Sequence, residues 1–374
     1  MHFLIITHVL HTAKDNKLYG YSPYVREMNL WLKQVDEVKV LAPFSSIQPT
    51  SIDLAYQHSA ITFIPVEQIS LTSISEIVKT LWHAPKIVWK IFKAMKQADH
   101  IHLRCPGNIG LLGCLVQICF PKKMKTAKYA GNWDPKSKQP LSYRFQKWIL
   151  SNAFLTKNMQ VLVYGDWENS SKNIKPFFTA TYSESEKLSL EKQNWNQKIR
   201  FIFAGTLSEG KNPMYAVRLA EQLQIMGIDV GLDLYGEGTE RHKLEKYIAE
   251  KKLENCVNLK GNQDKETLKK AYQNSHFIIL PSKSEGWPKV VAEGMFWGCI
   301  PVATSVSCVS NMLENGNRGI LLKMNLDQDV LQIANLLKNE SELEQKRKDA
   351  AHWSRQFTLE VFEEEIGELV VRSD

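Results

Sequence analysis

Short apolar runs alternate with longer amphipathic stretches along this chain. An apolar run bounded by turn residues is typical of a strand buried on both faces of a sheet, whereas apolar positions three or four residues apart predict a helix. In the first half, strands are expected at His2–Thr7, Val38–Pro43, Ile61–Val66, His100–Arg104, Lys125–Ala130 and Val161–Gly165. The helices between them are expected at Tyr24–Lys33, Ile74–Lys96, Asn108–Cys119 and Leu141–Ala153.

The second half repeats this rhythm. Its strands are expected at Ile199–Gly205, Gly231–Gly236, Val257–Gly261, Phe277–Pro281, Pro301–Thr304 and Gly319–Leu322. Its helices are expected at Pro213–Met226, Glu240–Lys251, Lys265–Asn274, Pro288–Trp297 and Gln328–Asn339. Because strand–helix alternation builds parallel sheets with helices on both faces, two such sets predict an α/β protein with two Rossmann-like domains.

The polar segment Ser183–Lys198 separates the two sets of elements and is the expected linker. We therefore predict an N-terminal domain over residues 1–185, a second domain over 186–340 and C-terminal helices over 341–374. The tail Glu342–Val371 has the pattern of two helices. These helices either cross back to the N-terminal domain or belong to the second domain, and the sequence does not separate the two arrangements.

The composition is that of an ordinary globular protein, with 374 residues of which 44% are hydrophobic and 23% charged. There is no apolar run long enough for a transmembrane helix, and the start MHFLIITHVL reads as a first strand rather than a signal peptide. Six cysteines are scattered without a CxxC pair, which favours a reducing cytosol over a disulfide framework or a zinc site.

The positive charge is concentrated in the first half. Residues 1–190 carry 23 Lys and Arg against 13 Asp and Glu, whereas residues 191–374 carry 24 against 27. A field of this sign attracts anionic surfaces such as membranes, phosphorylated lipids or nucleic acid, although a solvated basic face without a partner gives the same count.

Within the long helix of the first half, Val88, Ile91, Phe92 and Met95 recur at helical spacing, near Trp82 and Trp89 and three lysines. This helix either lies on an anionic membrane or covers the first sheet.

The segment from His276 to Thr304 carries the clearest chemical signal. It predicts a buried strand, a tight turn, a helix and a second strand, with Glu285 and Glu293 separated by seven residues. At the start of such a helix, free backbone N–H groups point at an anion such as phosphate. Glu293 lies about 9 Å further along the helix, which suits a carboxylate that accepts the hydroxyls of a ribose. Read singly, Glu285 is a helix cap and Glu293 a solvated residue.

Taken together, these residues and the junction residues Ser282, Gly286 and Pro288 resemble the E-x7-E signature of the retaining GT-B glycosyltransferases, in particular glycosyltransferase family 4. The resemblance covers about Ile199 to Leu322 and is weaker in the first half. It implies a GT-B fold with two parallel sheets facing a central cleft. It also implies that Glu285 contacts the transferred hexose and that Lys211 stabilises the departing diphosphate. Thr206 stands where the family has an arginine.

The other donor contacts implied by the resemblance are Gly205, Thr206, Tyr235, Gly236, Asn262, Ser282, Gly286, Trp287, Lys289 and Glu293. Simpler alternatives exist for several of them. The glycines can serve only the turns, Trp287 can pack in the core, and Lys289 either replaces the missing arginine or is solvated.

On the acceptor side, the residues singled out lie in segments expected to follow strands of the first domain. Gly20 lies in the loop expected over Thr12–Pro23, and Asn132, Trp133 and Asp134 follow a later strand. Arg104 takes the place where family members often have a histidine. It either contacts the acceptor or pairs with a neighbouring carboxylate.

The resulting hypothesis is a metal-independent, retaining hexosyltransferase with Glu285, Lys211 and Arg104 in catalytic roles and no cofactor besides its donor. The donor is a nucleotide diphosphate sugar and the acceptor a glycan or lipid-linked glycan, in bacterial surface polysaccharide or glycolipid synthesis. We expect a cytoplasmic protein at the inner face of an anionic membrane, with no nucleic-acid partner. The alternatives are a nucleotide-sugar epimerase of the same architecture and a non-catalytic nucleotide-sugar-binding subunit.

Overall fold

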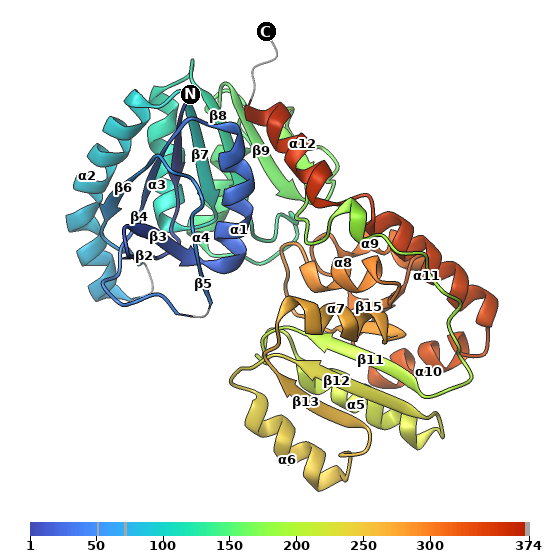
Figure 1. The fold of residues 1–374 in the computed structure, drawn as a ribbon. Coiled ribbons are helices and arrows are strands. Elements are labelled where there is room, and N and C mark those ends of the chain that lie inside the picture. The colour runs from blue at the N-terminus through green and yellow to red at the C-terminus, as the bar shows by residue number, and fades with distance from the viewer. Residues whose placement is uncertain (51, 71–72, 371–374) are drawn as a thin grey trace. The chain divides into compact units, whose positions relative to one another are not determined.

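The computed structural model describes residues 1–50, 52–70 and 73–370. The chain forms two compact units (Figure 1): the first comprises Met1–Phe178 with Phe362–Asp374, and the second is Thr179–Val361. The chain therefore changes unit at Phe178, ahead of the boundary placed at residue 185 by the sequence. The reason is that Phe178 packs on Phe362 within the first unit, with ring centroids 5.5 Å apart.

The first unit is built on a seven-stranded sheet. Its strands are β1 His2–Ile6, β4 Glu37–Pro43, β6 Ile61–Val66, β7 His100–Cys105, β8 Met124–Tyr129, β9 Met159–Tyr164 and β10 Ile174–Phe177. They lie in the order β10-β9-β8-β7-β1-β4-β6, and all neighbours are parallel. The parallel sheet is confirmed. The sequence did not predict β10, which is short and holds Pro176, as edge strands can.

A second, three-stranded sheet occupies most of the segment expected to be a loop, which corrects that prediction. It consists of β2 His11–Lys14, β3 Lys17–Tyr21 and β5 Asp53–Ala55. The turn between β2 and β3 is formed by Asp15 and Asn16, both with positive φ. Such a two-residue turn matches the twist of a hairpin, and Asp and Asn tolerate it better than most residues.

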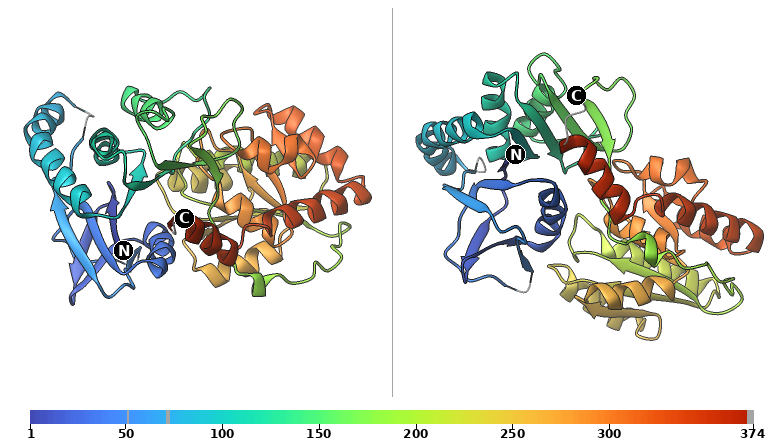
Figure 2. Two further views of the ribbon diagram at one scale, coloured as in Figure 1. Left: turned by 90° about the horizontal axis from the view of Figure 1, so that it is seen from above. Right: turned by 45° about the horizontal axis from the view of Figure 1, so that its top comes forward.

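Helices cover both faces of the large sheet in the first unit (Figure 2). One face carries α2 Ile74–Gln97, α3 Asn108–Val116 and α4 Leu141–Leu150. The opposite face carries α1 Ser22–Trp31, as right-handed crossovers require when the strand order reverses at β1. The short 3₁₀ helices are η1 Leu32–Gln34 and η2 Gln117–Cys119.

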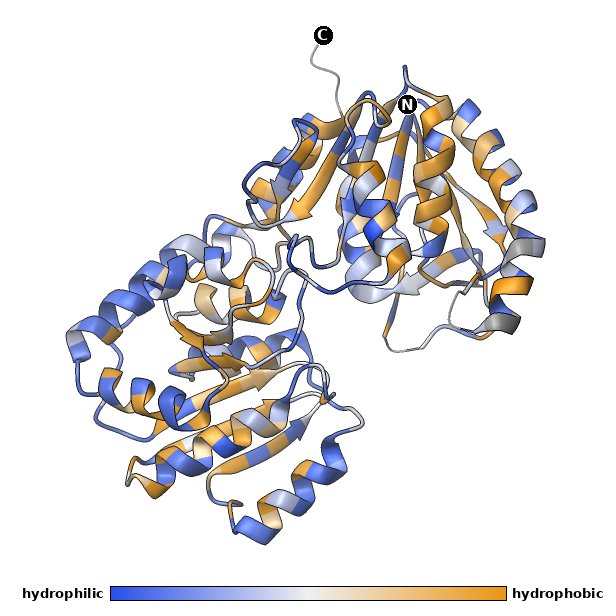
Figure 3. Ribbon diagram, turned by 180° about the vertical axis from the view of Figure 1, so that it is seen from behind, coloured by the Kyte–Doolittle hydropathy of each residue, from blue (hydrophilic) through white to orange (hydrophobic). Residues whose placement is uncertain are grey.

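The apolar stripe of α2 faces the sheet. Ile91 and Met95 are buried in the core, and Val88 and Phe92 pack against it. Of the two interpretations of this stripe, the structure supports the helix that covers the first sheet. Hydrophobic strands enclosed by helices with polar outer positions are seen in both units in Figure 3.

Two lysines of β8, which contribute to the positive charge counted in the first half, lie inside the first unit. Lys125 donates to the carbonyl of Phe120, and burial lowers its pKa to about 8. Lys128 is fully buried and donates to the carbonyl of Phe178 at 2.9 Å. Their positions in a strand covered on both faces leave these side chains no route to water.

The second unit is built on a six-stranded parallel sheet in the order β13-β12-β11-β14-β15-β16. The strands are β11 Ile199–Ala204, β12 Val230–Tyr235, β13 Val257–Gly261, β14 Phe277–Leu280, β15 Ile300–Thr304 and β16 Ile320–Leu322. All six were predicted within a few residues. The chain thus has two domains with parallel sheets, as expected for a GT-B protein.

The helices of the second unit divide between the two faces of its sheet. One face has α5 Pro213–Ile225, α6 Arg241–Lys251 and α10 Leu326–Leu336, and the other has α7 Lys265–Gln273, α8 Lys289–Phe296 and α11 Glu340–Ser354 (Figure 1). The remaining short elements are η3 Glu184–Glu186, α9 Val309–Met312 and η4 Glu314–Gly316.

The predicted tail contains two helices that belong to different units. Helix α11 packs on α8 in the second unit, whereas α12, Leu359–Val370, reaches the first unit from Phe362 onward. In the first unit, Lys175 pairs with Glu365 at 2.5 Å. Val371, the end predicted for the last helix, lies outside the described residues.

Candidate functional site

The donor residues inferred from the sequence lie mainly on four loops at the carboxyl edge of the six-stranded sheet in the second unit. Backbone hydrogen bonds tie these loops together: Gly205 N donates to Tyr235 O at 2.9 Å, and Gly236 N donates to Gly261 O at 2.8 Å. Lys283 N donates to the carbonyl of Gly210 at 2.8 Å, which joins the loop after β14 to the loop after β11. The carboxyl edge of an open α/β sheet is where such folds bind ligands.

Gly236 is required by the close approach of two of these loops. A Cβ atom at this position would lie 1.9 Å from the carbonyl oxygen of Gly205, and the φ angle of Gly236 is +143°. No other residue fits both the contact and the backbone conformation. The turn role of this glycine, one of its two interpretations from sequence, is therefore shown.

Lys211 and Glu285 come together although 74 residues separate them. The Nζ of Lys211 donates to both carboxylate oxygens of Glu285, at 2.6 and 2.8 Å. The Glu285 side chain is 7% exposed and that of Lys211 is 31% exposed. One side of the pair is therefore open to solvent, and an incoming anion can reach the ammonium group.

The loop that carries Glu285 is held from beneath by the end of β15. Thr304 Oγ1 donates to the carbonyl of Ser282 at 2.5 Å, and Ser307 Oγ donates to the carbonyl of Gly286 at 2.9 Å. The Ser282 side chain itself is buried, and its hydroxyl has no hydrogen-bond partner among the described residues. The Ser282 hydroxyl is therefore not at the surface, and its donor contact stays a prediction.

Glu293 lies on α8 and is already hydrogen-bonded by protein groups. One carboxylate oxygen accepts from Thr181 Oγ1 at 2.8 Å and the other from the Tyr272 hydroxyl at 3.2 Å. Burial, and then the nearby charge of Glu293, raises the pKa of Tyr272 far above its ordinary value, so this hydroxyl is a donor. Each carboxylate oxygen keeps a second lone pair that a ribose hydroxyl could use.

The other residues at the start of α8 have different surroundings. Trp287 packs in an aromatic cluster, with its ring 6.0 Å from that of Trp353 and 5.7 Å from that of Phe357. Of its two interpretations, packing is therefore the one shown. Lys289 lines a cavity of about 10 Å³ together with Glu293, which is space for about one water molecule. Thr206 is exposed and brings no charge to the loop after β11.

On the acceptor side, Arg104 ends β7 and pairs with a buried carboxylate. Its Nη1 donates to Glu27 Oε1 at 2.9 Å, and Lys128 Nζ lies 3.5 Å from the same oxygen. Burial raises the pKa of Glu27, but Arg104 and Lys128 outweigh it, so the net pKa is lowered and the carboxylate is charged. Pairing with a carboxylate, one of the two alternatives for Arg104, is thus shown, and 13% of this side chain remains exposed.

The other acceptor residues predicted from the sequence differ in their surroundings. The ring of Trp133 is buried against Tyr129, with centroids 4.8 Å apart, so its face is not available to a sugar. Asn132 and Asp134 make local turn hydrogen bonds to backbone N–H groups. Gly20 lies inside β3, with its open side filled by Val25. Trp133 is corrected to a core residue and Gly20 to a strand residue.

Sequence reasoning missed three residues, two in the second unit and one in the first. Thr181 and Tyr272 orient Glu293, but their distance from it in sequence gives no signal. His8 follows β1, and a Cβ at Gly107 would lie 2.6 Å from its Nδ1. Partial burial, and then the charge of Arg104, lowers the pKa of His8, which makes it neutral at physiological pH. Its position directly after a strand of a parallel sheet was the one usable signal.

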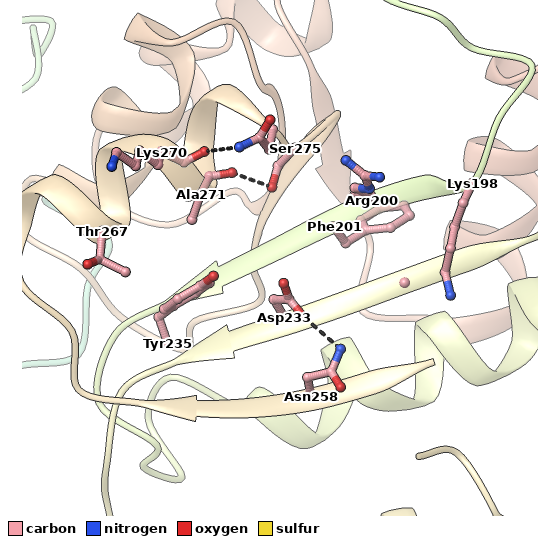
Figure 4. A pocket seen from close by; sticks show the side chains of 12 residues that line it. Lys198, Arg200, Phe201, Asp233, Tyr235, Asn258, Thr267, Lys270, Ala271 and Ser275 are labelled. Atoms are coloured by element: carbon pink, nitrogen blue, oxygen red, sulfur yellow. Dashed lines mark hydrogen bonds between the residues drawn. The ribbon is translucent and has the colours of Figure 1, made fainter. Parts of the chain in front are cut away.

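A pocket of the second unit lies on the face of its sheet rather than at its carboxyl edge (Figure 4). It has a volume of about 690 Å³ and runs beneath α7, with Arg200 and Asp233 on the strands and Lys198 directly before β11. Of the donor residues inferred from the sequence, Tyr235 lines it. The Lys211–Glu285 pair does not, so we place the candidate site at the loops and not in this pocket.

Residues 185–353 match the family model described as glycosyl transferases group 1. This part, which is less than half of the chain, is similar to that family. A poly(glycerol-phosphate) alpha-glucosyltransferase of Bacillus subtilis is 29% identical over 150 residues, which are 39% of this chain and 22% of that protein. An alpha-D-kanosaminyltransferase of Streptomyces kanamyceticus is 27% identical over 121 residues, 32% of this chain and 31% of that protein. The first three curated relatives are matched over 31 to 39% of their own length.

Solved structures of the same fold match nearly the whole chain. A sucrose-phosphate synthase from Thermosynechococcus elongatus has a TM-score of 0.66 at 18% identity, with 98% of each chain covered. HepE from Anabaena, solved in complex with UDP and glucose, has a TM-score of 0.67 at 13% identity, again with 98% of each chain covered. At these identities the likeness establishes the GT-B fold.

Proposed function

We propose that this chain is a retaining glycosyltransferase that moves a hexose from a nucleotide diphosphate sugar to a glycan or lipid-linked glycan. The observation that carries the proposal is the Lys211–Glu285 pair. It lies at the carboxyl edge of the six-stranded sheet in the second unit, next to the start of α8. A partly exposed ammonium and the N–H groups of a helix start suit a diphosphate, while a carboxylate beside them suits sugar hydroxyls.

In the proposed reaction, Lys211 stays where negative charge grows. As the bond between the anomeric carbon and the phosphate oxygen breaks, the diphosphate takes the electron pair, and Lys211 with the amides near Gly286 stabilises it. The acceptor hydroxyl attacks the same face of the sugar and passes its proton to the departing phosphate oxygen. The anomeric configuration is thereby kept. The fixed cation and the helix start supply the charge that a metal ion supplies in other transferases.

The remaining roles follow from position. Glu293 accepts hydrogen bonds from the ribose hydroxyls while it keeps those from Thr181 and Tyr272. Glu285 orients the hexose once the diphosphate also pairs with Lys211. Arg104 keeps most of its five N–H donors after pairing with Glu27, and we assign it to the acceptor. A lipid-linked acceptor places the reaction at a membrane surface, so the protein is peripheral to a membrane in this proposal. Such a reaction fits the synthesis of bacterial surface polysaccharide or glycolipid.

The proposal is tested by incubating the protein with UDP-, GDP- and ADP-hexoses and measuring release of the nucleoside diphosphate. A transferase releases it slowly by hydrolysis and faster with an acceptor, and the product keeps the anomeric configuration of the donor. Release of an epimerised sugar without any acceptor would instead indicate the epimerase.

Thr206 favours a second candidate, a non-catalytic subunit that binds nucleotide sugars. Its exposed hydroxyl replaces a charge that the resembled family uses on the diphosphate. This subunit would show thermal stabilisation by a nucleotide sugar with no release of nucleoside diphosphate. Replacing the missing charge, as in Thr206→Arg, would then increase binding but create no turnover.

A further inference from the structure

The outward face of α2 carries alternating lysine and tryptophan side chains. Lys79, Trp82, Lys86, Trp89 and Lys93 follow one another at spacings of three and four residues, which places all five on one side of the helix. Trp82 is 84% exposed and Trp89 is 65% exposed. The stripe is about 21 Å long at the rise of an α-helix. It lies opposite Ile87 and Ile91, which face the core.

The other two helices of the same layer also expose large apolar side chains. Helix α4 exposes Leu141, Phe145 and Trp148, and the rings of Phe145 and Trp148 are stacked 5.9 Å apart. Phe154 follows α4, is 76% exposed and lies beneath the ammonium group of Lys157 at 5.0 Å. Helix α3 packs between α2 and α4. The exposed large hydrophobic residues of this layer are Ile77, Val78, Trp82, Trp89, Leu115, Ile118, Leu141, Phe145, Trp148 and Phe154.

The same part of the chain has a strong excess of positive charge. Residues 73–157 contain 15 Lys and Arg against 3 Asp and Glu. Lys125 and Lys128 are buried and Arg104 is paired with Glu27, which leaves 12 cations toward the surface. Lys86 pairs with Glu67 and Lys79 with Glu76, and exposed pairs of this kind bind weakly enough to exchange for another anion.

These observations favour a lipid surface over a protein partner. Protein interfaces are depleted in lysine, whereas helices that lie on membranes combine lysine with tryptophan and other apolar residues. Two copies of this face would repel each other because both carry the same excess charge. The tryptophan ring suits the headgroup region, since it has an apolar body and one polar N–H group.

We infer that the outer surface of the α2–α3–α4 layer, with the Lys–Trp stripe of α2 at its centre, docks on an anionic phospholipid membrane. The lysines attract the headgroups, and Trp82 and Trp89 insert at the level of the headgroups. This inference identifies the surface of the protein that would contact the proposed membrane partner. Only the biological purpose of the contact rests on the proposed function. Binding to lipid needs neither donor nor acceptor.

Flotation with vesicles tests the inference. We expect the full chain to float with vesicles of equimolar phosphatidylcholine and phosphatidylglycerol, to float weakly with phosphatidylcholine alone, and to dissociate in high salt. The double variant Trp82→Ser, Trp89→Ser and the triple variant Lys79→Gln, Lys86→Gln, Lys93→Gln should each bind less. For the triple variant the expected loss is on the order of a hundredfold, at roughly fivefold for each lysine near the surface.

The control variant changes exposed lysines and an exposed apolar residue elsewhere on the first unit. Lys14 and Lys17 are exposed on the β2–β3 hairpin, and Ile47 is 72% exposed nearby. The variant Lys14→Gln, Lys17→Gln, Ile47→Ser should bind vesicles like the unchanged chain. Equal binding by the stripe variants and the unchanged chain would overturn the inference. So would absence of binding to anionic vesicles, or a self-association that the Trp82→Ser, Trp89→Ser variant abolishes.

The assay also separates this inference from the proposed activity. Glu285→Gln removes a donor contact in the second unit, and we expect its vesicle binding to be unchanged. If the chain proves to have no transferase activity but floats as described, the docking surface stands and the proposed function fails. The reverse result retains the proposed function and removes the docking surface. Within the described ranges of the chain, no helix is long and apolar enough to span a bilayer.

Discussion

The Lys211–Glu285 pair allows the donor-site proposal to be tested by a single substitution. Lys211→Met keeps most of the side-chain volume but removes the charge beside a carboxylate that is 7% exposed. An unpaired, fully buried charge costs about 3–5 kcal/mol. The Lys211 side chain is 31% exposed, so water reaches the pair, and we expect a smaller loss of stability of about 1–2 kcal/mol. For a domain of this size, that lowers the Tm by about 2–8 °C.

The expected effect on catalysis is larger than the effect on stability. Removing one fixed donor from a developing oxyanion costs about 3–4 kcal/mol of transition-state stabilisation, which is about 10²–10³ in kcat. The assay is release of nucleoside diphosphate under steady-state conditions, together with calorimetric binding of the nucleoside diphosphate. We expect kcat/KM to fall by at least this factor, and binding of the diphosphate to weaken.

Lys283→Met is the matched control. Lys283 lies in the loop after β14 and pairs with Glu209 at 2.6 Å, but both side chains are well exposed. We expect its stability and turnover to stay close to those of the unchanged chain. If Lys211→Met retains turnover within about threefold, Lys211 does not act on the leaving group and the reasoning is refuted.

Glu285→Gln gives a second test of the same pair. It releases Lys211 from its partner, so binding of the nucleoside diphosphate should be unchanged or tighter while turnover falls. A loss of diphosphate affinity as large as the loss of turnover would exchange the roles proposed for Glu285 and Lys211.

Three further predictions follow from the structure. Glu293→Ala should weaken binding of the nucleoside diphosphate by about 10- to 100-fold, because hydrogen bonds to a charged group are worth about 1.5–3 kcal/mol, and unchanged affinity in calorimetry would remove the ribose assignment. Gly236→Ala should destabilise the second unit by about 3 kcal/mol in thermal unfolding, because its Cβ would meet the backbone of Gly205, and an unchanged Tm would contradict the close approach. Burial lowers the pKa of His11 and of His100 to about 4, so the unfolded chain binds more protons at these residues between about pH 6.5 and 4. The free energy of unfolding of the first unit should therefore fall by about 2 kcal/mol per histidine by about pH 5. A pH-independent Tm over this range would contradict this prediction.

The pattern of apolar runs predicted most of the fold because the two large sheets are parallel and covered on both faces. In such sheets each strand is a continuous apolar segment, and β14, Phe277–Leu280, is an example with all four residues buried. The elements that escaped prediction lack this signal. The hairpin β2–β3 is largely polar with half-exposed positions, and β10 is an edge strand with a proline.

The candidate site was predicted on its donor side better than on its acceptor side. Glu285, Lys211 and Gly236 lie on short loops after strands, where sequence position alone determines the edge of the sheet on which a residue lies. Trp133 follows β8 and Arg104 lies near the end of β7, but their surroundings depend on segments far away in the sequence. The ring of Trp133 turned out to be buried and Arg104 to be paired with Glu27.

By itself, the sequence determined the order of strands and helices, the two-domain α/β class and the loops on which the donor residues lie, because these depend on local periodicity and on spacing within one strand–helix unit. Only the tertiary structure decided which distant groups meet: Lys211 with Glu285, and Glu293 with Thr181 and Tyr272. It also decided that Trp82 and Trp89 face solvent while Ile87 and Ile91 on the same helix are buried. The physical reason is that a side chain's environment is set by the segments packed against it, which contribute nothing to the local pattern.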